Sequence, residues 1–157
     1  MTLIVEDGSN VPGAQTYVSE TDAVTYATAR GYTFSQPIDQ VLLAAMDWLE
    51  AQQFIGIRGY YIQSLQWPRL KIMIDLYWVQ NNTIPQLLKD CECEIAIAID
   101  NGEAPFASIP DKITKIRASN IEIDYLNGSA STPINRKIML KLQKLIVGGG
   151  GFSTMRA

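Results

Sequence analysis

Two stretches of the chain repeat apolar side chains every three or four residues, and this spacing restricts what the chain can fold into. The apolar positions are Val41, Leu42, Ala45, Met46, Leu49 and Phe54 in the first stretch, and Leu87, Leu88, Cys91, Ile95, Ala98 and Ile99 in the second. Side chains at this spacing lie on one face of an α-helix. We therefore predict two amphipathic helices facing a core, with Asp39, Asp47 and Glu50 on the wet face of the first.

The N-terminal region is predicted to be an ordered arm followed by a helix. Residues 1–18 mix apolar residues with glycine, proline and asparagine, which is typical of short extended pieces broken by turns. Ser19 and Asp22 have the spacing of a capping box, and Gly31 offers the left-handed backbone that ends a helix. A first helix is therefore expected over residues 19–30.

Start and stop residues also bound the two amphipathic stretches. Ser35 offers a hydroxyl cap to a helix that runs to about Gln53. Thr83 and Gln86 form a second capping-box candidate, and the pair at 101–102, Asn-Gly, ends the helix that begins there.

The last third of the chain predicts a β-hairpin, a fourth helix and a tail. Residues 113–118 and 121–125 flank a Ser-Asn pair, and the second run alternates apolar and acidic side chains. Pro133 fits the first turn of a helix whose apolar positions are Ile134, Ile138, Leu142 and Leu145. The four glycines at 148–151 must end that helix, because glycine loses much conformational entropy in a helix.

These elements together predict a mainly α protein. It is a small bundle of about four helices with a β-hairpin near residues 113–125 and extended N- and C-terminal arms. One domain is expected over residues 1–147, with residues 148–157 as a flexible docking tail, because a chain of 157 residues can form one core without metals or disulfides. No apolar stretch approaches the roughly 18 to 20 residues that span a bilayer, so we expect no membrane contact.

The side-chain inventory argues against catalysis. The chain has no histidine, the commonest general base and metal ligand. Cys91 and Cys93 are interpreted as reduced, partly buried side chains, since two thiols without histidine leave zinc unsaturated. Asp90 and Glu94 share a helix face while Glu92 points elsewhere, so these carboxylates do not converge on a divalent metal. We expect no enzyme activity, no metal and no cofactor.

Charge is unevenly distributed along the chain. Residues 1–131 carry eight Lys and Arg against all sixteen Asp and Glu, a balance of −8. Residues 132–157 carry five cations and no acid. An acidic body with a basic C-terminal segment fits a docking or nucleic-acid-binding segment, and a solvated helix face is the alternative.

The segment over residues 55–82 has no helical period. Glycine and proline interrupt a run rich in tyrosine and tryptophan, which predicts short strands or a surface that faces a partner. Its aromatic side chains could stack on bases beside Arg58, Arg69 and Lys71. Against nucleic-acid binding stands the acidic balance of the body, which repels phosphates, so core and interface roles are favoured for the aromatics.

Several short motifs occur in a fixed order between residues 3 and 126. They are LIVEDGSNVPGAQTYVS at 3–19, ARG at 29–31, AMDWLE at 45–50, LQWPR at 65–69, IPQLLKD at 84–90 and the hairpin around 116–125. In these motifs the chain resembles a family of small proteins of tailed bacteriophages. It departs from the family pattern between Leu70 and Val79, where apolar residues stand in place of a more polar, glycine-containing loop.

The resemblance implies two functions, because family members carry two labels. The first is a structural virion protein, a head-to-tail adaptor that forms a ring of 12 copies between the portal and the tail and lines the DNA exit channel. The second is a DnaT-like single-stranded-DNA-binding protein of phage replication. For the adaptor, the implied partners are the portal, tail or neck proteins, and double-stranded DNA that passes through without sequence-specific binding. Its location would be the virion neck, after assembly in the cytoplasm of the bacterial host.

Two sets of residues are the candidate contacts of such an adaptor. The expected portal interface combines the tail with the basic face of the fourth helix: Gly148, Phe152, Met155, Arg156, Arg136, Lys137, Lys141 and Lys144. The expected subunit or tail interface combines the hairpin with two tryptophans: Lys115, Arg117, Glu122, Asp124, Trp67 and Trp78. The charges of the hairpin could equally be solvated.

Overall fold

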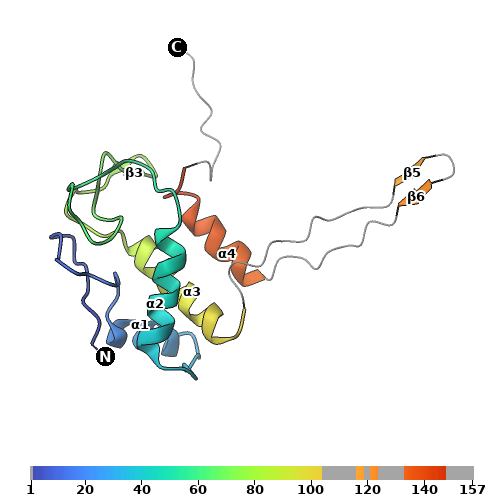
Figure 1. Ribbon diagram of the computed structural model, residues 1–157, viewed down its shortest axis with the longest axis horizontal. Coiled ribbons are helices and arrows are strands. Elements are labelled where there is room, and N and C mark those ends of the chain that lie inside the picture. Colours follow the sequence, from blue (N-terminus) through green and yellow to red (C-terminus); the bar gives the residue numbers. More distant parts are fainter. Residues whose placement is uncertain (1, 104–115, 119–120, 124–132, 148–157) are drawn as a thin grey trace, which may run out of the picture.

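Four helices form the body of the molecule (Figure 1). The computed structural model describes residues 2–103, 116–118, 121–123 and 133–147. The helices are α1 (Glu20–Thr28), α2 (Ile38–Glu50), α3 (Gln86–Asp100) and α4 (Pro133–Leu142). Because α3 packs against each of the other three, it is the centre of the bundle. The predicted mainly helical fold is confirmed, and none of the described helices is long and apolar enough to cross a membrane.

The apolar stripes of the helices meet in one core. All six predicted apolar positions from Val41 to Phe54 are buried, as are Leu88, Cys91, Ile95 and Ala98 of α3. The α4 side adds Ile138, Leu142 and Leu145. Burying a side chain of this size contributes about 1.5–3 kcal/mol, so this core is the main source of stability. Cys91 and Cys93 are free thiols inside it, and burial raises the pKa of each to about 12.

The N-terminal arm is ordered by hydrogen bonds of its own. Val5 bridges Thr16 in parallel, and the Glu6 amide donates to the Thr16 carbonyl at 2.8 Å. The fully buried Glu6 carboxylate accepts from three backbone amides of the turn that follows, those of Gly8, Asn10 and Val11. A charged acceptor holds such amides more strongly than a neutral one, which keeps the arm folded against the helices.

The first helix begins at the predicted cap and ends at Thr28, two residues before the predicted end. The Ser19 hydroxyl accepts from the Asp22 amide at 3.1 Å, and Gly31 has a φ of +72° after the last turn. The Asp22 carboxylate accepts from the Ser19 hydroxyl. In the predicted capping box it would instead accept from the Ser19 backbone amide. Burial of Ala23 and Ala27 seats the helix on α3.

The predicted caps at Ser35 and Thr83 are wrong. Helices α2 and α3 follow Pro37 and Pro85 directly, and neither start has a side-chain cap. Asp100, at the far end of α3, instead holds the turn that precedes α2, because its carboxylate accepts from the amides of Ser35 and Gln36 at 2.8 and 2.9 Å. Burial raises the pKa of Asp100, but hydrogen bonds from Tyr32 and from the Ser35 and Gln36 amides outweigh it and lower the pKa to about 2.

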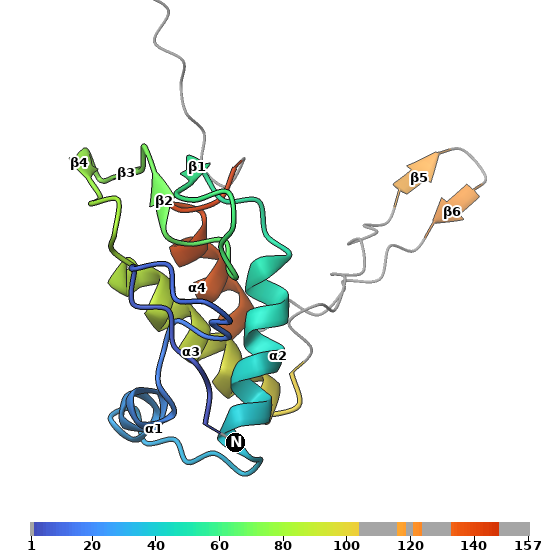
Figure 2. The same ribbon diagram turned by 60° about the vertical axis from the view of Figure 1, so that its left-hand side comes forward.

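Short antiparallel strands lie between α2 and α3 and between α3 and α4. β1 (Ile57–Arg58) pairs with β2 (Arg69–Leu70), and β3 (Met73–Ile74) pairs with β4 (Tyr77–Trp78). These strands lie where α2 ends and α3 begins (Figure 2), as predicted for a segment that had lost its helical period. The predicted hairpin is confirmed as β5 (Ile116–Ala118) and β6 (Ile121–Ile123). Among the described elements β5 and β6 contact only each other, and they stand away from the helices (Figures 1 and 2).

Candidate interaction surface

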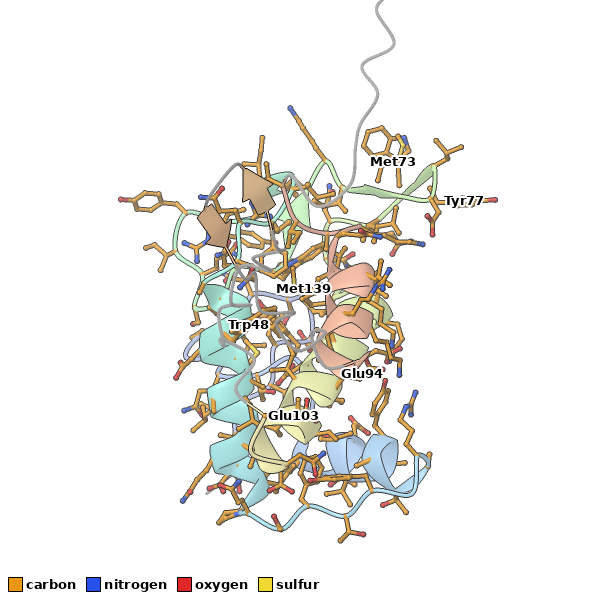
Figure 3. The ribbon with its side chains drawn as sticks, turned by 90° about the vertical axis from the view of Figure 1, so that its right-hand side faces the viewer. Trp48, Met73, Tyr77, Glu94, Glu103 and Met139 are labelled. Carbon is orange, nitrogen blue, oxygen red and sulfur yellow. The ribbon has the colours of Figure 1, made fainter. Side chains whose placement is uncertain are left out.

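Large apolar side chains are exposed together at one end of the molecule. We call this surface the apolar end, and it consists of Ile57, Tyr60, Tyr61, Ile62, Met73, Leu76, Tyr77 and Trp78. Tyr61 is 98% exposed and Leu76 88% exposed, and Tyr77 points away from the body (Figure 3). Large apolar side chains that gather in the exposed loops at one end of a protein favour a site of contact with another molecule.

A buried arginine holds the loops beneath the apolar end. Arg69 has lost almost all contact with solvent, and its guanidinium donates to the carbonyls of Phe54, Ile55 and Gly56 at 2.7–3.1 Å. It also donates to the Gln66 carbonyl and side chain. Arg69 therefore fixes the loops from inside and does not present its charge to a nucleic acid, which corrects the role considered from the sequence.

Gly56 allows the close approach of the two loops. Its φ is +77°, and a Cβ at this position would lie 2.4 Å from the Leu70 carbonyl oxygen and 2.3 Å from the Ile72 side chain. Any larger residue would push β2 away from the end of α2.

The turn between β3 and β4 is strained and projects from the apolar end. Ile74 pairs with Tyr77, so the turn has two residues, Asp75 and Leu76, with φ values of +50° and +70°. Such turns favour Asn-Gly, and a bulky residue in the left-handed region costs about 1–2 kcal/mol. The Lys144 ammonium lies 2.7 and 3.0 Å from the Asp75 carboxylate oxygens and ties the turn to α4. Backbone strain of this kind concentrates at binding sites.

The two predicted interface tryptophans differ in position. Trp78 is 69% exposed in β4 and belongs to the apolar end. Trp67 is fully buried, with its ring edge-on to Phe54 at 6.0 Å between centroids. The assignment of Trp67 to an interface is therefore wrong, because a side chain inside the core cannot reach a partner. The segment around Trp67 has no regular spacing of apolar residues, so its burial could not be inferred from the sequence.

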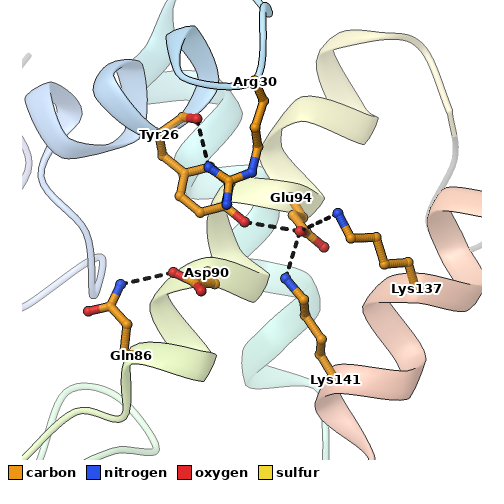
Figure 4. A network of polar contacts seen from close by, with 7 residues as sticks. All are labelled: Tyr26, Arg30, Gln86, Asp90, Glu94, Lys137 and Lys141. Carbon is orange, nitrogen blue, oxygen red and sulfur yellow. Dashed lines mark hydrogen bonds and ion pairs between the residues drawn. The ribbon is translucent and has the colours of Figure 1, made fainter.

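Two lysines of the basic face of α4 bind a buried carboxylate of α3, although the face itself is largely exposed. Lys137 and Lys141 bind one oxygen of Glu94 at 2.9 and 2.7 Å, and the Tyr26 hydroxyl donates to the same oxygen (Figure 4). Arg30 lies over the Tyr26 ring at 3.3 Å. Burial raises the pKa of Glu94, but the hydrogen bonds from the two lysines and Tyr26 outweigh it and lower the pKa. The cluster locks α1, α3 and α4 together.

The other expected contact residues are placed only in part. Arg136 is exposed on α4. Lys144 is partly exposed and forms an ion pair with Asp75. Arg117 and Glu122 lie opposite each other in the register of β5 and β6. The remaining expected contacts lie outside the described residues: Lys115, Asp124, Gly148, Phe152, Met155 and Arg156.

A pocket between α1 and α3 offers little chemistry. It has a volume of about 300 Å³ and is lined from α1 and α3 by residues that include Asp22, Tyr26, Lys89 and Cys93. Burial raises the pKa of Cys93 to about 12, so the thiol stays protonated and is a poor nucleophile. Within the described ranges no three His, Cys, Asp or Glu side chains come together as a metal site would require.

The fold and the apolar end define a small four-helix protein with a separate hairpin and an exposed surface of the kind that binds other macromolecules. Over residues 1–157 the chain matches the model of a family described as "Putative DnaT-like ssDNA binding protein", and it belongs to that family. No curated protein and no solved structure gives a significant match. Of the two functions implied by the sequence resemblance, the family description agrees with single-stranded DNA binding rather than with the adaptor.

Proposed function

We propose that the chain is a structural protein of the virion, a head-to-tail adaptor that forms a ring between the portal and the tail. The observation that carries the proposal is the apolar end. Eight exposed apolar side chains, on loops that Arg69 ties together from inside, match the composition of protein–protein contact centres, which are rich in aromatic residues and methionine. A partner that covers this surface would remove it from water.

The chemistry of the apolar end favours a protein partner over a nucleic acid. Half of its side chains, Ile57, Ile62, Met73 and Leu76, are aliphatic and have no ring on which a base can stack. Of Arg58, Arg69 and Lys71, the cations predicted beside the aromatic side chains, Arg69 is buried and donates to the carbonyls of the fold. Stacking platforms for single strands instead combine aromatic rings with a groove of free cations.

A ring suits the arrangement of the described elements. In a closed cyclic ring each subunit uses two different surfaces, so a projecting element on one copy can reach its neighbour. The apolar end and the β5–β6 hairpin are two such surfaces on separate parts of the chain. We expect 12 copies, as the sequence resemblance implies, with the acidic body offering passing double-stranded DNA few cations to bind.

The portal contact is assigned to the C-terminal segment. Gly148, Phe152, Met155 and Arg156 are its expected anchors. On α4, Arg136 keeps an outward charge, and Lys137 and Lys141 orient the helix through Glu94. Lys144, two residues after the helix, binds Asp75. Deletion of residues 148–157 should abolish portal binding and leave the helical body folded. Normal portal binding by the truncated chain would move the contact to the body.

The second candidate function is single-stranded DNA binding. It is favoured by the family description and by the four exposed aromatic side chains of the apolar end, Tyr60, Tyr61, Tyr77 and Trp78. Lys71 and Arg58 are exposed nearby and could contact phosphates. In this function the same surface would hold a strand of DNA.

A titration with labelled oligo(dT) at two salt concentrations distinguishes the two functions. For DNA binding, affinity should fall with a slope of about −0.7 per phosphate contact on logarithmic scales, and Lys71→Ala should reduce that slope. For the adaptor, Lys71→Ala should leave ring formation and portal binding unchanged, while Leu76→Asp should abolish contacts made by the apolar end. Tight, salt-sensitive binding that Lys71→Ala weakens would favour the second candidate.

A further inference from the structure

A carboxylic acid in the middle of α3 is sealed beneath the N-terminal arm. Glu92 is completely buried. One of its oxygens accepts from the Tyr17 amide at 3.1 Å, and the other makes a short contact with the Thr16 hydroxyl. Both partners belong to the arm, which means that Glu92 joins the arm to the central helix.

The hydrogen-bond count at Thr16 indicates which group supplies the proton. The Thr16 hydroxyl donates to the Val18 carbonyl at 2.9 Å and accepts from the Val18 amide at 3.2 Å. A hydroxyl has one proton to donate and two lone pairs. If that proton goes to Val18, the contact between Thr16 and Glu92 needs a proton from the carboxyl. A neutral Glu92 therefore satisfies every donor and acceptor in the group, whereas an ionised Glu92 takes the proton from Val18.

The charges around Glu92 do not compensate an ionised form. Lys89, one turn earlier on α3, is the cation that acts on it, and Glu50 on α2 opposes the negative charge. The other titratable groups that face it are neutral, the Tyr17 phenol from the arm and the Cys93 thiol from α3. Burial raises the pKa of Glu92 to about 8, even when the Thr16 hydroxyl is counted with the Tyr17 amide as a donor to the carboxylate.

We propose that Glu92 carries a proton while the N-terminal arm is docked and loses it when the arm is released, so that docking of residues 2–18 is controlled by pH. The effect extends to the base of the apolar end. The Tyr17 hydroxyl donates to Glu50 at 2.6 Å and accepts from the Trp67 amide at 3.2 Å. Release of the arm removes these bonds from the loops that carry the exposed side chains. The inference does not depend on the identity of the partner.

The protonation state is tested on the unaltered chain by carboxyl ¹³C NMR between pH 4 and 10. The Glu92 resonance is identified by its absence from the spectrum of Glu92→Gln. We expect a titration midpoint near 8 for this resonance. A midpoint near the ordinary value of 4.5 would overturn the proposal, because Glu92 would then be ionised in the docked state at neutral pH.

Release of the arm is tested by amide hydrogen exchange of residues 16–18, corrected for the intrinsic pH dependence of exchange. In the unaltered chain the opening equilibrium should rise by about tenfold per pH unit between pH 5 and 8 and then level off. In Glu92→Gln this rise should be much smaller, because the amide can donate to Thr16 and accept from Tyr17 without titrating and only Glu50, whose pKa burial also raises, still titrates against the arm. Asp47→Asn, at an exposed site on α2, is the matched control and should behave like the unaltered chain. Identical pH profiles for Glu92→Gln and the unaltered chain would contradict the coupling.

Discussion

The carboxylate of Asp100, the last residue of α3, accepts a hydrogen bond from the backbone amide of Ser35 at 2.8 Å, across 65 positions of the sequence. With the Gln36 amide and the Ser35 and Tyr32 hydroxyls, this contact organises the turn that leads into α2. The end of one helix thereby fixes the start of another, and the two helices with the longest apolar faces cannot separate without breaking it.

Asp100→Ala is expected to destabilise the protein by about 1–3 kcal/mol, because it leaves the amides of Ser35 and Gln36 without their charged acceptor. Urea unfolding measures the change. The contribution should also depend on pH. Because the folded-state pKa of about 2 lies below the ordinary value of 3.8, the stabilisation is present at neutral pH and is lost as the pH falls from about 4 to 2. An unaltered midpoint for Asp100→Ala at pH 7 would show that the contact between α3 and this turn is dispensable.

The two lysines on Glu94 should contribute unequally. Lys141 is 27% exposed, whereas Lys137 is 59% exposed and more strongly screened by water. We expect Lys141→Met to destabilise the fold by about 1–3 kcal/mol through loss of a charged hydrogen bond to a buried carboxylate. Lys137→Met should change stability by less than about 1 kcal/mol. Thermal unfolding of both variants tests this order, and a larger effect at Lys137 would contradict the geometry.

Leu76→Gly separates stability from binding. Leu76 has a φ of +70° and an 88% exposed side chain, so glycine relieves backbone strain and loses almost no packing. The variant should be more stable by up to about 1 kcal/mol. Its ability to form rings or to bind the portal should nevertheless fall, because the tip of the apolar end is gone. Calorimetry and sizing by light scattering measure the two effects. Unchanged assembly by a stabilised variant would remove Leu76 from the interface.

Global stability should decrease with pH because of Glu92. Its folded-state pKa of about 8 lies above the ordinary 4.5, so the folded protein binds the extra proton between these values. Stability conferred by the neutral acid is therefore fully present below pH 4.5 and is lost as the pH rises to 8, at up to about 1.4 kcal/mol per pH unit. Urea unfolding at pH 5, 6.5 and 8 should show this decrease in the unaltered chain and a smaller one in Glu92→Gln.

Local sequence signals predict the helices well because those signals act over one or two turns. The apolar stripe from Val41 to Phe54, the cap at Ser19 and the stop at Gly31 each depend on neighbours a few residues away. The turn pair at 119–120 likewise lies between two runs that pair as strands.

The contacts that the sequence did not reveal are those between distant positions. Acidic residues on helices ordinarily face water, yet Glu92 is buried by an arm 75 positions away and Glu50 is half-buried against Tyr17. Trp67 sits in a segment without period, so nothing local indicates its burial. The apolar end could be anticipated as a partner-facing region, but not the strained turn that presents Leu76.

Electron microscopy of the full chain mixed with its portal tests the central claim most directly. The adaptor account predicts a closed ring seated on the portal, with the apolar end buried against a neighbouring protein and residues 148–157 in contact with the portal. A chain that stays unassembled beside free portals, and that binds oligo(dT) tightly in a salt-sensitive way, would contradict it and assign the apolar end to single-stranded DNA.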